Sequence, residues 1–203
     1  MPSAQTVFEG RLVHTDPQGF DEFGIAVAAS QGSDGAWRLL VGAFDRGPND
    51  EGAAYVYRRD TVAGAWALEA ELLSPTTSFW FGRNVSLLGD LALPGDYADR
   101  FTPFLRNAAT GAWEADTVIA GFRDRTGNES WAAALPGGAY VAVTTGATGP
   151  QTQPGTHQGA LFVFRRGASG QWAREDTLVV PPVPPLVEWI LGACGMEALS
   201  TGE

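Results

Sequence analysis

The chain has 203 residues, of which 44% are hydrophobic and 18% charged, and its formal net charge is −10. This acidic balance argues against binding to nucleic-acid backbones and to anionic membrane surfaces, because both select for lysine and arginine. No uncharged apolar run approaches the length of about 20 residues that a transmembrane helix needs, so membrane insertion is not expected. The 26 glycines and 13 prolines favour many turns and short strands over long helices.

The beginning of the chain predicts one isolated strand. Residues 1–16 contain neither a basic start nor an apolar core segment, so they lack the pattern of a signal peptide. Residues 9–17 (EGRLVHTDP) align with the run EAELLSP at 69–75, which closes the first repeat described next. We therefore expect an orphan outer strand near 9–17 that has no sheet of its own.

The next stretch predicts one complete four-stranded sheet. Four short apolar runs, separated by Gly, Asp, Asn and Pro, span residues 23–30, 38–44, 53–59 and 66–73. Val, Ile, Tyr and Phe dominate these runs, and turn formers separate them, as in antiparallel strands joined by tight turns. Four strands in a repeat of this length are typical of one blade of a β-propeller.

The same pattern returns twice downstream. The second copy predicts strands on both sides of the turn at 88–90, a third strand at 101–106 and a fourth beginning at Trp113. The third copy predicts strands at 131–134, 139–144 and 160–166 and a fourth beginning at Trp172. Its third strand, ALFVFRR, closely echoes AAYVYRR in the first copy.

These repeats predict an all-β domain over 1–180, with about three four-stranded antiparallel blades near 22–78, 79–125 and 126–180. Closed propellers have at least about four blades. Three explanations therefore remain open: a fragment of a longer protein, an open arc, or a homo-oligomeric ring built from two or more chains.

The segment 181–203 is expected to lie outside this domain. It begins with PPVPP, which predicts an extended connector, since proline cannot donate ladder hydrogen bonds. Residues 186–193 then predict a short helix that either packs on the propeller or a partner, or belongs to a dangling tail. The single cysteine, Cys194, is interpreted as a small apolar residue.

Three tryptophans mark the register of the repeats. Trp66, Trp113 and Trp172 each follow a Gly-Ala or Gly-Gln turn and recur at roughly 50-residue intervals. A large ring at the start of an outer strand covers the seam of its blade. We therefore predict that these tryptophans belong to the scaffold rather than to a ligand platform.

Two short motifs resemble a known family. The pair Phe23-Gly24 followed by VGA at 41–43 resembles the FG-GAP repeat of integrin α-subunit propellers and related surface proteins. The second copy keeps Phe81-Gly82 but has Leu-Pro-Gly at 93–95, and the third has Thr-Gly at 126–127. The resemblance implies a ring of four-stranded blades and suggests a secreted or cell-surface location. It implies no single activity, because the family includes adhesion receptors, lectins and accessory domains beside enzymes.

The resemblance also implies a calcium loop after the GAP segment, since calcium prefers about six to eight oxygen ligands. The matching place is DRGPNDEG at 45–52, where Asp45, Asn49 and Asp50 are the candidate metal ligands. The spacing departs from the family pattern, and Arg46 adds a positive charge to the loop. The alternative is an ordinary solvated turn.

The sequence predicts no catalytic site and no cofactor besides calcium. No Gly-x-Ser-x-Gly elbow occurs, and the two histidines, His14 and His157, fall in the orphan strand and in a long polar loop. We therefore expect a non-enzymatic binding or adhesion module that recognises a protein or carbohydrate ligand through its loops. The alternatives are an accessory propeller domain or fragment of a larger hydrolase, and a truncated gene product without independent function.

Overall fold

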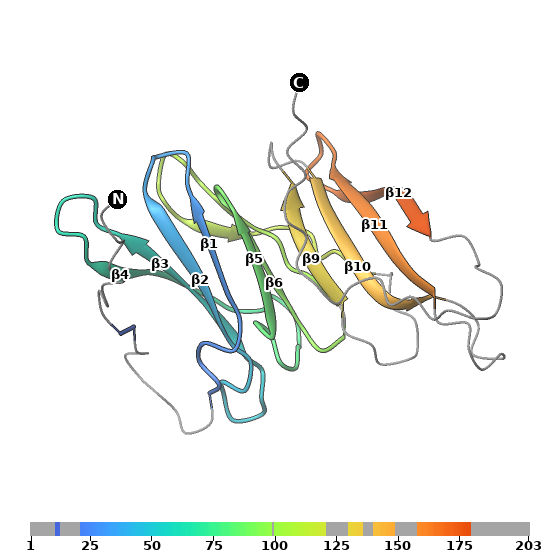
Figure 1. Cartoon of the computed structure of the whole chain (residues 1–203), viewed down its shortest axis with the longest axis horizontal. Coiled ribbons are helices and arrows are strands. Elements are labelled where there is room, and N and C mark those ends of the chain that lie inside the picture. Colours follow the sequence, from blue (N-terminus) through green and yellow to red (C-terminus); the bar gives the residue numbers. More distant parts are fainter. Residues whose placement is uncertain are drawn as a thin grey trace, which may run out of the picture.

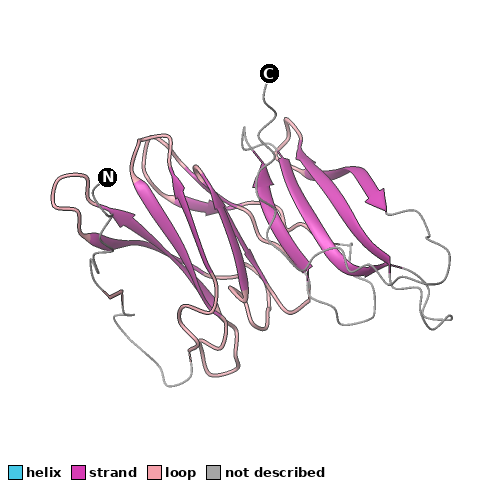
Figure 2. Ribbon diagram, in the orientation of Figure 1, coloured by secondary structure: helices cyan, strands magenta, loops and turns pink. Residues whose placement is uncertain are grey.

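The computed structural model describes residues 11–12, 21–98, 100–120, 130–135, 140–148 and 158–179. This part of the chain consists of strands, turns and loops, as Figure 2 shows. Within these residues no helix is long and apolar enough to cross a membrane. The expected C-terminal helix at 186–193 lies outside the described residues. Of the expected orphan strand, only Arg11 and Leu12 are described, and neither is in a strand.

In the described residues, twelve strands form three sheets of four antiparallel strands each. The first sheet contains β1 (Val27–Gln31), β2 (Trp37–Ala43), β3 (Ala53–Arg59) and β4 (Trp66–Leu72). The second contains β5 (Asn84–Leu88), β6 (Leu91–Gly95), β7 (Phe104–Arg106) and β8 (Trp113–Ala115). The third contains β9 (Ser130–Leu135), β10 (Tyr140–Thr148), β11 (Gln158–Arg166) and β12 (Trp172–Val179). The all-β prediction of three four-stranded antiparallel sheets is confirmed.

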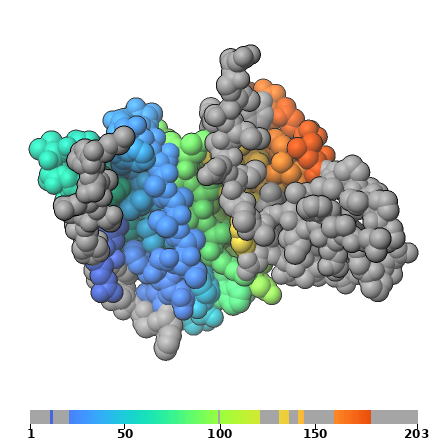
Figure 3. Space-filling model, viewed as in Figure 1, coloured from blue at the N-terminus to red at the C-terminus, as the bar shows by residue number. Residues whose placement is uncertain are grey.

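The sheets follow one another in chain order, from the blue first sheet to the orange third sheet in Figure 1. Within each sheet the strands pair in sequence order. The first strands of the sheets are neighbours, because β1 contacts β5 and β5 contacts β9. In the space-filling view, the blue atoms of the first sheet and the green atoms of the second meet along their length (Figure 3).

Two strands begin later than the sequence predicts. β1 begins at Val27 rather than at residue 23, because Gly24 has a φ of +97° and the Ile25 amide donates to the Glu22 carbonyl in a turn. β7 begins at Phe104 rather than at residue 101, because Pro103 has no amide hydrogen to continue the ladder. Phe101 instead forms isolated bridges on both of its sides.

The two FG motifs lie in turns that tie the start of the first and the second sheet to the second strand of the same sheet. The Gly24 amide donates to the Gly42 carbonyl, and the Gly82 amide donates to the Gly95 carbonyl, at 2.9 Å in both cases. Gly95 therefore does in the second sheet what the middle glycine of VGA does in the first. Gly82 has a φ of +87°, and a Cβ there would overlap the Ala53 carbonyl oxygen, so the position requires glycine.

Among the residues that the structure describes, three apolar clusters form the core, two of them between successive sheets. One cluster joins the first and second sheets through residues that include Leu72, Phe81 and Phe104. A second joins the second and third sheets through residues that include Ile119 and Phe162. The third covers the opposite face of the first sheet. Sheets packed face to face by their side chains are what a propeller arrangement requires.

The three register-marking tryptophans belong to these clusters. Trp66, Trp113 and Trp172 are half-buried, and each packs against one of the three clusters. The prediction that they are scaffold residues is confirmed.

Candidate functional site

The predicted calcium loop lies between β2 and β3 and pairs with the chain as it enters the second sheet. The Trp80 amide donates to the Asp50 carbonyl at 2.8 Å, and the Phe81 amide donates to the Glu51 carbonyl at 3.1 Å. Gly52 also forms a parallel bridge with Phe81. The loop is therefore part of the seam between two sheets as well as a surface turn.

Only some of the side chains in this loop are arranged to bind a cation. Partial burial raises the pKa of the Asp45 carboxyl, and the nearby negative charges of Asp50 and Glu22 raise it further. Asn49 instead donates through Nδ2 to Glu51 Oε1 at 2.8 Å, which lowers the pKa of the Glu51 carboxyl. Among the described residues, no group of three or more histidine, cysteine or acidic side chains is arranged to hold a metal ion. The three-residue calcium site stays a prediction.

Arg46 does not place its charge among these candidate ligands. Its guanidinium Nη2 lies 3.0 Å from Glu71 Oε1, and the same group lies 5.9 Å from the centre of the Tyr55 ring. Both partners belong to β3 and β4 rather than to the loop. The expected electrostatic conflict between Arg46 and a bound cation is therefore reduced.

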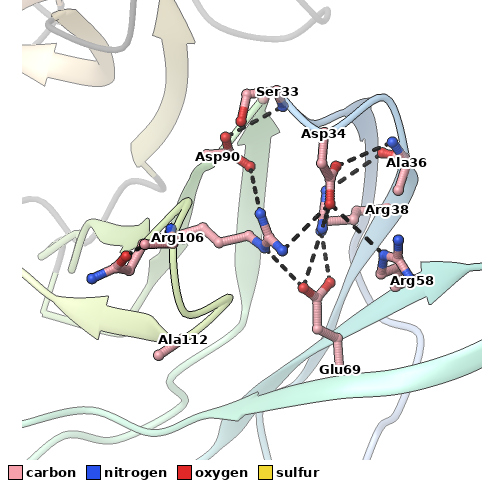
Figure 4. A network of polar contacts seen from close by, with 12 residues as sticks. Ser33, Asp34, Ala36, Arg38, Arg58, Glu69, Asp90, Arg106 and Ala112 are labelled. Carbon is pink, nitrogen blue, oxygen red and sulfur yellow. Dashed lines mark hydrogen bonds and ion pairs between the residues drawn. The ribbon is translucent and has the colours of Figure 1, made fainter.

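A network of ion pairs lies between the first and second sheets (Figure 4). Its centre is the fully buried Arg38 of β2, whose Nη1 and Nη2 each donate at 2.8 Å to Asp34. Arg38 Nε also donates to Glu69 at 2.6 Å. Forked contacts of this kind hold a guanidinium rigidly and hold the pKa of the Asp34 carboxyl well below its usual range.

The second sheet contributes Arg106 to this network. Arg106 Nε donates to Glu69 at 2.9 Å, and its Nη2 lies 3.3 Å from Asp34. Asp90 approaches the same guanidinium at 3.8 Å and accepts a hydrogen bond from the Ser33 amide. The opposite charges in this network pair with one another across the seam. We interpret it as a structural clamp rather than a reactive site.

A groove lies where the first strands of the three sheets meet. It has a volume of about 560 Å³ and is lined by Ile25, Ala26, Val27, Phe44, Arg83, Asn84, Val85, Trp131 and Ala132. Ile25, Val27 and Trp131 are between 41% and 64% exposed. Large apolar side chains gathered at this exposure, with a guanidinium and an amide beside them, make a surface suited to ligand binding.

The groove was not predicted from the sequence. Its lining residues come from three different repeats and from turns that only the fold brings together. One available signal was the pair Phe23-Gly24 and Phe81-Gly82, because Ile25 and Arg83 directly follow these motifs. His14, His157 and Cys194 lie outside the described residues.

Comparison with known proteins supports the fold and the repeat. The family model for the FG-GAP repeat matches residues 6–57, so the chain carries an FG-GAP repeat and the resemblance of the first copy is confirmed. No curated protein matches the chain.

One solved structure shares the fold, and a second covers a similar share of the chain. The crystal structure of Saccharomyces cerevisiae Sqt1 aligns with a TM-score of 0.53 and 10% identity, over 80% of this chain and 37% of that chain. A Lactobacillus plantarum protein aligns with a TM-score of 0.48 and 17% identity, over 74% of this chain and 40% of that chain. The chain thus spans less than half the length of both proteins. It is an all-β, propeller-like protein with an FG-GAP repeat.

Proposed function

We propose that the chain is a non-enzymatic binding module of the adhesion type, which holds a protein ligand in the groove between β1, β5 and β9. The observation that carries this proposal is the groove itself, in which exposed apolar side chains from successive sheets surround about 560 Å³. Its volume lies within the range of about 300–1,000 Å³ that is typical of ligand pockets.

The lining favours an extended peptide with apolar side chains. Ile25 and Val27 offer aliphatic surface, and burial of such surface contributes about 25 cal/mol per Å². Arg83 and Asn84 line the same groove and provide hydrogen-bonding groups suited to main-chain carbonyls. Val27 lies in β1, and the hydrogen bond from the Ile25 amide to the Glu22 carbonyl holds Ile25 in the preceding turn, which lowers the entropy lost on binding.

A carbohydrate ligand is the second candidate, and Trp131 is the observation that favours it. The indole is 41% exposed and shares the groove with Arg83 and Asn84. An apolar ring beside polar donors suits a sugar, which presents apolar ring faces and hydroxyl groups together.

The groove is tested by selecting binders from a random peptide library and from a printed glycan array. We expect peptides with apolar side chains to bind, without turnover, and the double variant Ile25→Ser, Trp131→Ala to lose at least about tenfold in affinity, or about 1.4 kcal/mol. The control is Val62→Ser, an exposed residue in the β3–β4 turn. If the double variant and the wild type bind equally, the groove is not the site. Chemical turnover of a bound ligand would favour the hydrolase alternative.

We further propose that Asp45 and Asp50, with Asn49, hold a calcium ion. The loop that carries these residues is held in place by the hydrogen bonds from the Trp80 and Phe81 amides to the Asp50 and Glu51 carbonyls. Burial first, and then the negative charge of Asp50, raise the pKa of Asp45, and a cation would relieve the second of these causes. Millimolar calcium should raise the melting temperature of the wild type, and Asp45→Asn with Asp50→Asn should abolish the shift. Glu114→Gln serves as a control on the exposed surface of β8. An unchanged melting temperature would remove the calcium proposal and leave the groove untouched.

A further inference from the structure

The end of each sheet repeats one side-chain pattern. A tryptophan begins the fourth strand, an acidic residue follows three positions later, and an aliphatic residue follows six positions later. The three sets are Trp66, Glu69 and Leu72; Trp113, Asp116 and Ile119; and Trp172, Glu175 and Leu178. In β4 and β12 the acidic residue is also the extra residue of a β-bulge, as the strand registers show.

In the first two sets, the next sheet covers the aliphatic and the acidic side chains. Leu72 is 2% and Ile119 is 1% exposed, and each belongs to a cluster that joins two sheets. The carboxylates of Glu69 and Asp116 are 14% and 13% exposed. A following sheet is therefore what buries this pattern.

Each covered carboxylate binds an arginine of the following sheet. Arg106 Nε lies 2.9 Å from Glu69 Oε1, and Arg166 Nε lies 2.6 Å from Asp116 Oδ2. Both arginines end the third strand of their sheet, and both stand opposite the tryptophan of the fourth strand. The same contact thus recurs at both seams.

The third set lies at the end of the described repeats, where its side chains stay exposed. Leu178 is 53% exposed, although it stands opposite Leu161 in β11 as Leu72 stands opposite Ala54 in β3. The Glu175 side chain is 44% exposed and lies 3.5 Å from the more exposed Arg165 of its own sheet. We call the surface formed by Leu161, Val163, Glu175, Asp176 and Leu178 the far face of the third sheet.

The first sheet carries the matching arginine. Arg59 ends β3 opposite Trp66, which is the position that Arg106 and Arg166 hold in their sheets. Its Nε donates to the Gly64 carbonyl of its own turn at 3.3 Å. Arg59 shares the parity of Tyr55 and Tyr57, whose cluster covers the open face of the first sheet, so its positive charge suits a far face that presents Glu175.

We propose that the far face of the third sheet binds the first sheet of a second copy of this chain, with Arg59 of that copy on Glu175. Such a contact is heterologous, because it joins two different surfaces, and it closes into a ring when the rotation allows. Two copies supply six sheets, which lies within the range of about four to eight blades that propellers contain.

The docked far face takes the place of a contact that Leu12 makes within its own chain. Leu12 packs against the cluster on the open side of the first sheet, near Tyr55 and Phe23. It follows Glu9 by three positions, as Leu178 follows Glu175. Leu178 of a docking copy therefore takes the place of Leu12, so the association exchanges one aliphatic contact for another and adds the rest of the far face.

The test measures molar mass by light scattering and sedimentation equilibrium from low to high micromolar concentration. The wild type should approach twice 21.4 kDa. Glu175→Arg and Arg59→Glu should each raise the dissociation constant at least about tenfold, because each places like charges opposite one another. Glu114→Arg, an exposed charge reversal on β8, should leave the wild-type mass unchanged.

Mixing the two variants gives the sharpest result. In a one-to-one mixture of Glu175→Arg and Arg59→Glu, every head-to-tail contact joins opposite charges again, so the mixture should recover the wild-type mass. Recovery also shows that both variants are folded. A wild type that stays monomeric throughout, or a mixture that stays as monomeric as its parts, would overturn the proposal and indicate an occupant other than a second copy.

Discussion

Both seams between sheets contain an arginine–carboxylate ion pair, which we call the repeated clamp, but the two seams differ in what surrounds it. At the first seam, Glu69 lies within a network that also includes Arg38, Asp34 and Arg106. At the second seam, Asp116 pairs with Arg166 and accepts a hydrogen bond from Trp172 Nε1 at 3.3 Å.

The apolar clusters of the two seams both contain aromatic rings. The cluster of the second seam includes Phe101, Phe162 and Phe164, and that of the first seam includes Phe81 and Phe104, whose ring centres lie 6.3 Å apart. The comparison indicates that the first seam adds a buried charge network to its apolar packing, while the arginine–carboxylate contact is present at both seams.

The largest expected effect concerns the buried charge of the first seam. Arg38→Met leaves Asp34 and Glu69 without their central partner, and breaking a buried ion pair in this way costs about 3–5 kcal/mol. The matched control is Arg58→Met, whose guanidinium is more exposed and lies 3.9 Å from Asp34, so its loss should stay below about 1 kcal/mol. Urea unfolding measures both values. Equal losses would show that burial of Arg38 does not dominate the seam.

The next effect concerns the apolar cluster of the second seam. Ile119→Ala removes a buried side chain from the cluster between the second and third sheets and should lower the free energy of unfolding by about 2–5 kcal/mol. Leu178→Ala removes the equivalent side chain of the third sheet, which is half-exposed, and should lower it by less than about 1 kcal/mol when measured at a concentration where the chain is monomeric. Similar losses at both positions would contradict the described packing.

A smaller effect separates two glycines with left-handed backbones. Gly82→Ala places a Cβ against the Ala53 carbonyl at the first seam and should cost about 2–3 kcal/mol. Gly89→Ala has a φ of +60° but no neighbour within 4 Å, so only backbone strain of about 1 kcal/mol is expected. Thermal unfolding of the two variants compares them directly, and a tolerated Gly82→Ala would indicate that the FG turn does not touch β3.

The smallest effect is a pH dependence of the first seam. Arg38, its strongest partner, holds the pKa of Asp34 below the ordinary value of 3.8, and the Ala36 amide, Arg106 and Arg58 also face this carboxylate. The stability from Asp34 is therefore present above about pH 4 and is lost as the pH falls towards the lower pKa of the folded state. Asp34→Asn should flatten the fall in urea midpoint between about pH 5 and pH 2. If the urea midpoint of Asp34→Asn falls with pH as steeply as that of the wild type, Asp34 is not the cause of the pH dependence. Glu114→Gln is the control and should behave as the wild type.

The repeat count and the strands could be predicted because they depend on local patterns. Runs such as AAYVYRR and ALFVFRR alternate and end at turn formers, and they became β3 and β11. The beginnings of β1 and β7 were missed because a turn at Gly24 and a missing amide at Pro103 interrupt apolar runs that otherwise have strand composition.

The contacts between sheets could not be predicted in the same way. The groove combines Ile25 with Trp131, and the first seam combines Asp34 with Arg106, although these pairs are far apart in the sequence. The arginine at the end of each third strand was visible in the repeat, but its acidic partner belongs to the preceding sheet. Only the packing of one sheet on the next identifies that pair.

The most direct test of the repeated clamp is a double-mutant cycle on Arg166→Met and Asp116→Ala, with the free energies of unfolding measured in urea. These side chains lie 2.6 Å apart and belong to different sheets. The described packing predicts a coupling energy of about 1 kcal/mol or more between them. A coupling energy of zero, with both variants folded, would contradict the clamp and with it the placement of the third sheet on the second.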